Sequence, residues 1–245
     1  MGNAKFSVII PAQNEEQYIG KCLRAIGIAA QVVAPDTVET IVVANRCTDK
    51  TQEIAASLGA RVLVNDNKCI AAVRNAGVRA AAGEIIVTVD ADSLMGKETL
   101  AEIKEKLESG KYVGGGSNFK FDRMSFGIAC SALYVGINML PVMLKNGGFL
   151  SGAMFWCRKE DFDAINGFDE SLISLEDMDF AVRLKRLGTQ RKKKYGTLKR
   201  TPLVTSSRKF DAFGDWYLIK NRKLTKRIFT GRDREAADQF YYDVR

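Results

Sequence analysis

Two pairs of acidic residues have the types and spacing best suited to chemistry in this sequence. Asp90 and Asp92 directly follow the apolar run 84–89. Two carboxylates at i and i+2 after a strand can turn toward one point, where their hard oxygen atoms suit Mg²⁺ or Mn²⁺, and such an ion can bridge a diphosphate. The alternative is a turn that caps the next helix, which the pattern Asp-x-Asp-Ser also suits.

Glu176 and Asp177 form the second pair, at the start of a helical pattern that runs to Gly188. Acidic residues stabilise a helix N-terminus through the helix dipole, which is the simpler explanation for them. Adjacent carboxylates also repel each other, which raises the pKa of one and suits it to act as a general base. Because the chain has no histidine, a carboxylate is the usual group left for that role.

The absence of histidine and the pattern of cysteines exclude several kinds of site. Without histidine there is no Ser-His-Asp or Cys-His catalysis and no histidine-containing zinc site. The five cysteines are widely spaced and include no Cys-x-x-Cys pair, which fits reduced thiols in the cytosol better than disulfides or a metal cluster. The N-terminus lacks a signal-peptide pattern. We therefore expect a cytoplasmic protein.

The charge is distributed unevenly along the 245 residues. Residues 1–180 carry 18 basic and 23 acidic side chains, whereas residues 181–245 carry 19 and 6. Such a basic region suits an anionic membrane, a phosphorylated substrate or nucleic acid, and the alternative is a solvated helix face. The longest basic run, Arg191–Lys194, is short and lacks interleaved aromatic residues, so we expect no nucleic acid partner.

Short apolar runs alternate with helical patterns in the first part of the chain. Strands are predicted at 6–10, 40–44, 60–64 and 84–89, and helices at 15–30, 48–58 and 70–82. This alternation predicts an α/β fold with a doubly wound, mostly parallel sheet and helices on both faces. Further on, the patterns predict a strand entered at about 156, helices at 159–165 and 176–188, and extended residues at 203–205.

Polar clusters follow three of the four predicted strands, at 11–15, 44–49 and 90–92. Ligands of open α/β sheets bind at the carboxyl ends of the strands, so these clusters should meet at one rim. The turn after the first strand has neither a G-x-G-x-x-G nor a Walker pattern, which disfavours NAD and ordinary ATP binding.

The stretch 124–144 contains no charged residue and is long enough to span a membrane. Its apolarity is lowered by Gly127, Ser131, Gly136, Asn138 and Pro141. A span would also put the two halves of the chain on opposite sides of the bilayer, where they could not build one site. We therefore expect a buried or interfacial helix, which is a candidate for membrane contact or for a homodimer interface.

Taken together, the motifs resemble those of the family 2 glycosyltransferases. The similarity covers roughly residues 5–210 and rests on the order and spacing of Ser7–Glu15, Val43–Thr51, Arg74–Gly77 with Gly83–Glu84, Asp90–Asp92 and Glu176–Asp177. It implies the GT-A fold, as a single domain 1–245 with a nucleotide-sugar-binding half (1–123) and an acceptor-binding half (124–245). The implied activity is the metal-dependent, inverting transfer of one sugar to a hydroxyl of a glycan, a lipid-linked molecule or a small molecule.

The resemblance also implies roles for single residues. The donor, a UDP- or GDP-sugar, would be bound by Pro11, Gln13, Glu15, Asn45, Arg74, Asp90 and Arg208. Asp90 and Asp92 match the DXD metal motif for Mn²⁺ or Mg²⁺, and Asp177 matches the general base, with Glu176 as support. The acceptor would meet Gly148, Ser151, Gly152 and Trp156, although Trp156 suits a core position equally well. Two departures stand out: Asn45 replaces the usual Asp at the base, and no histidine is present for the metal.

Two other functions are weighed against glycosyl transfer. A nucleotidyltransferase that makes sugar nucleotides typically has a Gly-rich loop with Arg near the first strand, which residues 11–15 lack. A non-catalytic nucleotide-binding module would use the basic C-terminal region. The Gln-x-x-Arg-Trp motif of processive family members is absent, which favours transfer of a single sugar. The basic region and residues 124–144 together suit peripheral contact with the inner face of a membrane and a lipid-linked acceptor.

Overall fold

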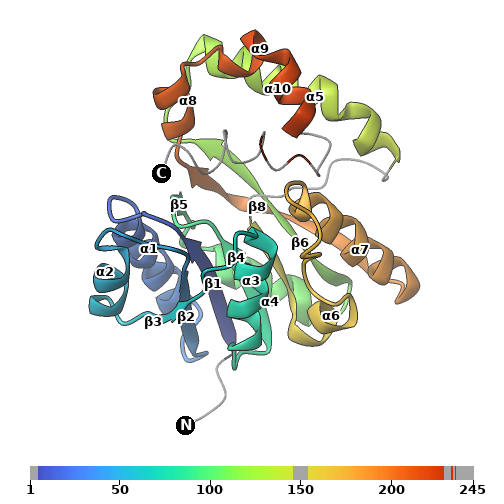
Figure 1. Ribbon diagram of the computed structural model, residues 1–245. Coiled ribbons are helices and arrows are strands. Elements are labelled where there is room, and N and C mark those ends of the chain that lie inside the picture. Colours follow the sequence, from blue (N-terminus) through green and yellow to red (C-terminus); the bar gives the residue numbers. More distant parts are fainter. Residues whose placement is uncertain (1–4, 146–153, 229–232, 234, 236–245) are drawn as a thin grey trace.

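The computed structural model describes residues 5–145, 154–228, 233 and 235 (Figure 1). Within these residues the strands form one eight-stranded sheet in the order β3-β2-β1-β4-β7-β6-β8-β5. Their bounds are β1 Phe6–Ala12, β2 Val38–Ala44, β3 Arg61–Val64, β4 Ile85–Val89, β5 Ser93–Leu94, β6 Tyr112–Phe121, β7 Met154–Arg158 and β8 Lys194–Thr205.

The first four strands are parallel, as the alternation of strands and helices predicts. β1 was expected to end at Pro11, but it continues to Ala12, with Pro11 in register with Val43 of β2. Pairing between β1 and β4 stops at Ile9, so Pro11 has a strand partner on one side only. Proline lacks an amide hydrogen and is tolerated where one side of a strand is unpaired.

Beyond β4 the sheet is mixed. β7 runs antiparallel to β4 and β6, and β5 runs antiparallel to β8. β6 was not expected, because the run Gly114–Gly116 has little strand preference. The glycines have a packing role: a Cβ atom at Gly115 or Gly196 would lie within 3.0 Å of the Trp156 ring. Trp156 is fully buried there, and its indole N–H donates to the carbonyl of Gly116 at 3.0 Å.

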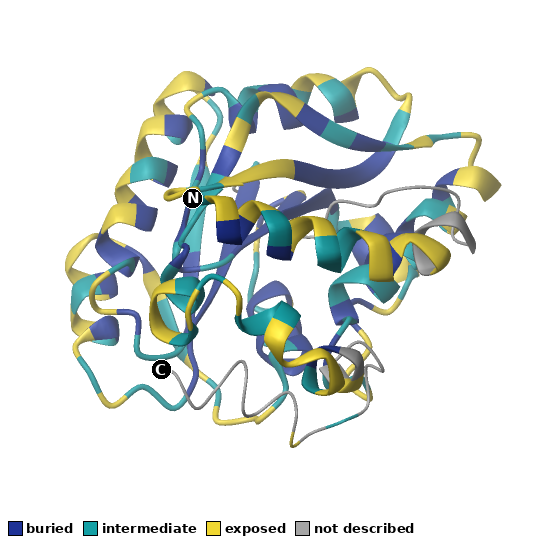
Figure 2. Cartoon of the chain, turned by 90° about the horizontal axis from the view of Figure 1, so that it is seen from above, coloured by how far each residue is buried: buried dark blue, intermediate teal, exposed yellow. Residues whose placement is uncertain are grey.

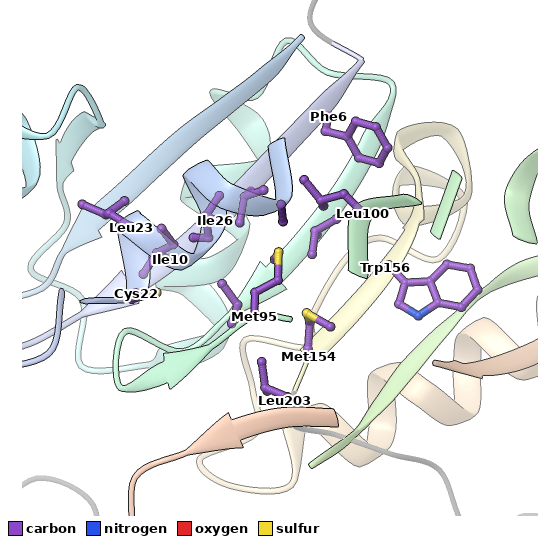
Figure 3. Packing of buried hydrophobic residues seen from close by; sticks show 14 of the residues in the cluster. Phe6, Ile10, Cys22, Leu23, Ile26, Met95, Leu100, Met154, Trp156 and Leu203 are labelled. Carbon is purple, nitrogen blue, oxygen red and sulfur yellow. The ribbon is translucent and has the colours of Figure 1, made fainter. Parts of the chain in front are cut away.

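Helices cover both faces of the sheet. They are α1 Ile19–Val32, α2 Thr51–Ser57, α3 Ile70–Arg79, α4 Thr99–Glu108, α5 Phe126–Lys145, α6 Lys159–Ala164, α7 Glu176–Gln190, α8 Arg208–Phe213, α9 Tyr217–Lys220 and α10 Arg222–Ile228. Side chains of a strand alternate between faces, so Val8 and Ile10 of β1 pack with α1 and α4, while Ile9 packs with α3 and α7. Figure 3 shows the first of these clusters, with Ile10 beside Cys22, Leu23 and Ile26 of α1.

The helix expected at 124–144 is α5, which forms a layer beyond the sheet together with α8, α9 and α10 (Figure 1). Asp215 joins this layer: its carboxylate pairs with Arg123, and its carbonyl accepts a hydrogen bond from Ser131 at 2.6 Å. No helix in the described part of the chain is long and apolar enough to cross a membrane. One face of α5 is exposed rather than buried. Figure 2 shows how exposed residues, in yellow, and buried residues, in dark blue, are distributed over the chain.

Candidate active site

The polar loops after β1 and β2 are tied to each other, as their place at one rim of the sheet predicts. Asn14 Oδ1 accepts a hydrogen bond from the backbone N–H of Thr48 at 2.8 Å. The backbone N–H of Glu15 donates to Thr51 Oγ1 at 2.7 Å, and that of Asn45 donates to the carbonyl of Ala12 at 2.8 Å. These contacts hold the first two loops as one unit, with the Glu15 side chain buried beneath it.

Arg74 on α3 joins the two acidic pairs. Its guanidinium contacts Glu176 Oε1 at 2.7 Å and Asp90 Oδ1 at 3.1 Å, and it lies 5.3 Å from the centre of the Phe168 ring. The Arg74 side chain is 9% exposed and that of Glu176 is 11% exposed, so their ion pair is shielded from water, whereas the Asp90 side chain is 46% exposed. The end of β4 and the start of α7, far apart in sequence, therefore meet through one guanidinium.

A second arginine, Arg208, closes the other side of the site. It comes from the start of α8 and makes a two-pronged contact with both carboxylate oxygens of Glu15, at 2.6 Å each. Its Nη2 also lies 3.0 Å from Asp92 Oδ2. The guanidinium lies over the ring of Tyr18, 4.8 Å from its centre. The basic C-terminal region thus reaches the residues at the ends of β1 and β4.

Asp177 lies beside Glu176 at the start of α7, and its surroundings raise its pKa to about 7. Burial is the main cause, and the negative charge of Glu176 acts in the same direction, while Arg74 opposes both. Asp177 accepts a hydrogen bond from the backbone N–H of Met178 at 2.7 Å. A carboxyl group with a pKa near neutrality can take up and release a proton, which is what a general base requires.

Three residues around the site have left-handed backbone conformations without being glycine. Asn14 has φ 52°, Arg46 has φ 51° and Leu175 has φ 64°. Such a conformation is unfavourable for a residue with a Cβ atom, and most of all for Leu. They lie in the loops after β1 and β2 and directly before Glu176, so the backbone is held under strain where the candidate side chains are presented.

Gln13 and Asn45 have the properties of ligand-binding residues. Gln13 Oε1 is buried and has no hydrogen-bond partner among the described residues, so it can accept an N–H or O–H from a ligand. The side-chain amide of Asn45 donates to the carbonyls of Asn65 and Asn67, which fixes its orientation. Its Oδ1 faces Arg46 Nε at 3.4 Å, so the group this side chain can offer a base is an acceptor.

Asp90 and Asp92 suit a divalent cation by donor type, since both present carboxylate oxygens at the end of β4. In the described part of the chain no third acidic, cysteine or histidine side chain completes a metal-binding group with them. The remaining ligands of an ion held there would come from a bound diphosphate and water, which is usual for Mg²⁺ beside phosphates.

Of the four acceptor residues expected from the resemblance, three lie outside the described residues and the fourth is buried in the core. Gly148, Ser151 and Gly152 lie outside the described residues. Trp156 is a correction: it is fully buried among β6, β7 and β8 and presents no ring face to an acceptor. Its large apolar surface is removed from water there, which is the alternative that the sequence left open.

Sequence reasoning missed Tyr18. It falls within the helix predicted at 15–30, whereas α1 begins at Ile19 and Tyr18 precedes it as the N-cap. The only sequence signal was its position three residues after Glu15, because nothing local indicates that Arg208 will lie over its ring.

Comparison of the sequence with protein families gives one match that covers well over half of the chain. Residues 7–165 match the sequence model described as Glycosyl transferase family 2. An uncharacterized glycosyltransferase of Mycobacterium tuberculosis is 32% identical over 110 residues, which are 45% of this chain and 47% of that protein. The glycosyltransferase AglE of Haloferax volcanii is 25% identical over 189 residues, 74% of this chain and 62% of that one. The match to the mycobacterial relative therefore spans about half of its length.

Solved structures with the same fold include those of two enzymes. Residues 1–349 of TarS from Staphylococcus aureus, in complex with UDP-GlcNAc, superpose with a TM-score of 0.62 at 20% identity, covering 98% of this chain and 71% of that one. Glucosyl-3-phosphoglycerate synthase from Mycobacterium tuberculosis, in complex with Mn²⁺, UDP and glucosyl-3-phosphoglycerate, has a TM-score of 0.63 at 18% identity, covering 94% and 80%.

Proposed function

The chain belongs to glycosyl transferase family 2, and from that premise we propose that it transfers one sugar from a nucleotide-sugar donor to an acceptor hydroxyl, with inversion and with a divalent metal. That it is a glycosyltransferase with the GT-A fold follows from the family match and the structural neighbours. The observation that supports the finer proposal most is the Arg74 bridge, which joins Asp90 at the end of β4 to Glu176 beside Asp177.

We assign the donor to the rim at the ends of β1, β2 and β4, with Pro11 in the wall after β1. Glu15 would bind the ribose, Asn45 the base, and Arg74 the diphosphate. Gln13 has a buried acceptor ready for a donor group of the nucleotide. A divalent ion held by Asp90 and Asp92 supplies positive charge that stabilises the departing diphosphate.

Asp177 would remove the proton from the acceptor hydroxyl while that oxygen attacks the anomeric carbon from the face opposite the diphosphate. One displacement of this kind inverts the configuration. The pKa of Asp177 near 7 suits proton transfer at neutral pH. Glu176 helps to keep that pKa high, and Arg74 holds Glu176 in place. The acceptor would enter from the half of the chain that begins at residue 124.

The first donors to test are UDP-sugars. Neighbours in structure are complexed with UDP-GlcNAc in one case and with UDP and Mn²⁺ in the other. An acceptor atom at Asn45 Oδ1 suits the imide N–H of uracil, and it equally suits the ring N–H of guanine. GDP-sugars are therefore the matched comparison.

We further propose that the protein contacts an anionic membrane peripherally and takes a lipid-linked acceptor there. Phe126, Leu133, Ile137 and Leu140 of α5 are 49–78% exposed, and their spacing of seven, four and three residues puts them on one helix face. The adjacent α9 and α10 carry exposed cations, Lys220, Arg222 and Lys223. An apolar helix face beside basic residues is complementary to anionic lipid.

The experiment that tests transfer measures sugar-nucleotide consumption with and without Mn²⁺, using UDP- and GDP-sugars and an extract of lipid-linked acceptors. We expect acceptor-dependent release of the nucleoside diphosphate and a glycosylated product, both lost in Asp92→Asn. The control is Arg200→Gln, which removes an exposed ion pair with Glu105 away from the site. Release of pyrophosphate from a sugar phosphate and a nucleoside triphosphate would show a nucleotidyltransferase instead, and nucleotide binding without turnover would show a binding module.

A further inference from the structure

Arg208 lies on two acidic residues that the proposed donor complex needs for other purposes. Its guanidinium contacts both oxygens of Glu15, which would bind the ribose, and Oδ2 of Asp92, which would bind the metal. These contacts join the start of α8 directly to the ends of β1 and β4. A divalent ion bound to Asp92 would therefore compete with Arg208 for the Asp92 carboxylate.

We propose that Arg208 is a counter-ion that the metal displaces: it holds Asp92 and Glu15 in the donor-free protein and transfers to the donor diphosphate when metal and nucleotide bind together. This inference rests on the metal-dependent function proposed above. It makes metal binding conditional on the nucleotide, because without a diphosphate to receive it Arg208 stays near Asp92 and repels a second cation.

The position of Arg208 in the fold allows this exchange by side-chain movement alone. The backbone before it is anchored: β5 pairs with the end of β8 through Ser93 and Thr205, and the N–H of Ser206 donates to the carbonyl of Asp92 at 3.2 Å. The N–H of Ser207 donates to Asp122 Oδ1 at 2.9 Å. The Cα atom of Arg208 therefore stays beside the site while its long side chain has room to change partners.

Arg74 differs from Arg208 in a way that separates their roles. The Arg74 side chain is 9% exposed and is anchored to Glu176 as well as to Asp90. The Arg208 side chain is 20% exposed, and among the described residues it contacts Glu15, Asp92 and the Tyr18 ring beneath it, the first two of which a metal–nucleotide complex would occupy. Arg74 is thus suited to a fixed position and Arg208 to an exchange.

The test measures Mn²⁺ binding to the full chain without nucleotide, from the loss of the free Mn²⁺ paramagnetic resonance signal. Arg208→Gln removes the ion pair between Arg208 and the buried Glu15, so the double variant Glu15→Gln/Arg208→Gln is measured beside it to keep a folded protein in the test. We expect both to bind Mn²⁺ alone about fivefold tighter than the wild type, or more, a usual size for coupling between sites. Glu15→Gln alone keeps Arg208 beside Asp92, so it should show no such gain.

A second readout is the effect of Mn²⁺ on UDP affinity, measured by calorimetry. Mn²⁺ should strengthen UDP binding less in the Arg208 variants than in the wild type or in Arg200→Gln, and Arg208→Lys should recover part of the difference. Equal or weaker binding of Mn²⁺ alone in both Arg208 variants would overturn the inference while leaving the proposed function standing. If the wild type binds no Mn²⁺ even with UDP, the metal dependence itself is wrong, and this inference falls with it.

Discussion

The side chain of Asp177 combines an unfavourable position with the chemistry proposed for it. Partial burial of its carboxylate and the second negative charge of Glu176 beside it raise its pKa to about 7 from the usual 3.8. The left-handed backbone of Leu175 adds strain directly before this pair. Unfavourable local terms gathered at one place are typical of a site selected for reactivity rather than stability.

The pKa of Asp177 predicts how activity depends on pH. Because the base must be ionised, kcat/KM should rise with pH through a midpoint near 7, the value raised by burial. Asp177→Asn should lower kcat about 10²–10⁴-fold, the usual contribution of general-base catalysis, while UDP affinity stays close to that of the wild type. Rates from pH 5 to 9 and UDP calorimetry measure both. An unchanged kcat in the variant would remove Asp177 from the mechanism.

The raised pKa of Asp177 also predicts that stability falls as pH rises, in the opposite direction to the change in activity. Between pH 3.8 and about 7 the folded protein holds the proton of Asp177 while the unfolded chain has released it. The free energy of unfolding therefore falls as pH rises through this window, and above it the full cost of the buried charge remains. Asp177→Asn should melt at a higher temperature than the wild type at pH 8, and this difference should shrink toward pH 4. The exposed Asp66→Asn serves as the control, and a difference that does not depend on pH would contradict the prediction.

Elements near the site are fixed by close packing of helix backbone against strand side chains. α3, which carries Arg74, lies against β1 and β2 at Gly77. A Cβ atom there would overlap Cγ2 of Ile9 and lie 2.9 Å from Cγ2 of Val43. Glycine at this position allows the helix to approach closely enough for the guanidinium of Arg74 to reach Asp90.

Gly77→Ala should therefore destabilise the protein by about 1–3 kcal/mol through overpacking, with loss of the alignment of Arg74. Gly27→Ala is the matched control, since Gly27 is an exposed helical glycine of α1 with nothing within 4 Å of its Cβ position. That change should stabilise the protein by up to about 1 kcal/mol, because alanine favours helix. Urea denaturation measures both, and the same sign for the two variants would contradict the packing argument.

Elements whose apolar pattern is local were predictable from the sequence, and elements that depend on distant partners were not. The four parallel strands were found because each contains a local apolar run, which in β1 and β4 is buried on both faces, although β3 lies at the edge of the sheet and is partly exposed. β6 was missed because its glycines make sense only against Trp156, which lies forty residues further along the chain. β8 was predicted only at its end, 203–205, since its first residues, Lys194-Tyr-Gly-Thr-Leu198, form no apolar run and are followed by the basic pair Lys199-Arg200.

The candidate site, too, was predictable where the sequence pattern is local and not where it depends on distant partners. The resemblance identified Asp90, Arg74, Glu176 and Asp177, and the structure brings all four together. The pairings themselves were beyond sequence reasoning: Arg74 meets Glu176 across 102 positions and Arg208 meets Glu15 across 193. Such ion pairs depend on how the second half of the sheet is placed, which no local spacing encodes.

At the scale of the whole molecule, charge and exposed apolar surface lie in the same layer. Residues 181–245 carry 19 basic and 6 acidic side chains, and α8, α9 and α10 belong to this region. They pack with α5, whose exposed face is apolar, and the ring of Phe126 meets that of Trp216 at 6.0 Å. One layer of the molecule thus presents both exposed apolar side chains and basic side chains, the two kinds of group that favour contact with an anionic bilayer.

This arrangement predicts salt-sensitive binding to vesicles that contain anionic lipid. The double variant Leu133→Glu/Ile137→Glu should float with such vesicles several-fold less than the wild type, because each change puts a negative charge on the apolar face. Val64→Glu on β3 is the control, since Val64 is similarly exposed, at 64%, but lies at the far edge of the sheet. Should the double variant instead convert a dimer into a monomer, with no lipid binding by either form, the face would be an interface between copies.

The contact between Glu15 and Arg208 has a consequence for the order in which this protein comes into being. A ribosome that has released the first 180 residues has already made β1, β2, β3 and β4, so the core around them can form. The contact between Glu15 and Arg208 cannot form then, because α8 and the strand β8 before it are still to be synthesised. Until synthesis has passed residue 208, the nascent chain thus lacks the ion pair that joins the end of β1 to the C-terminal region.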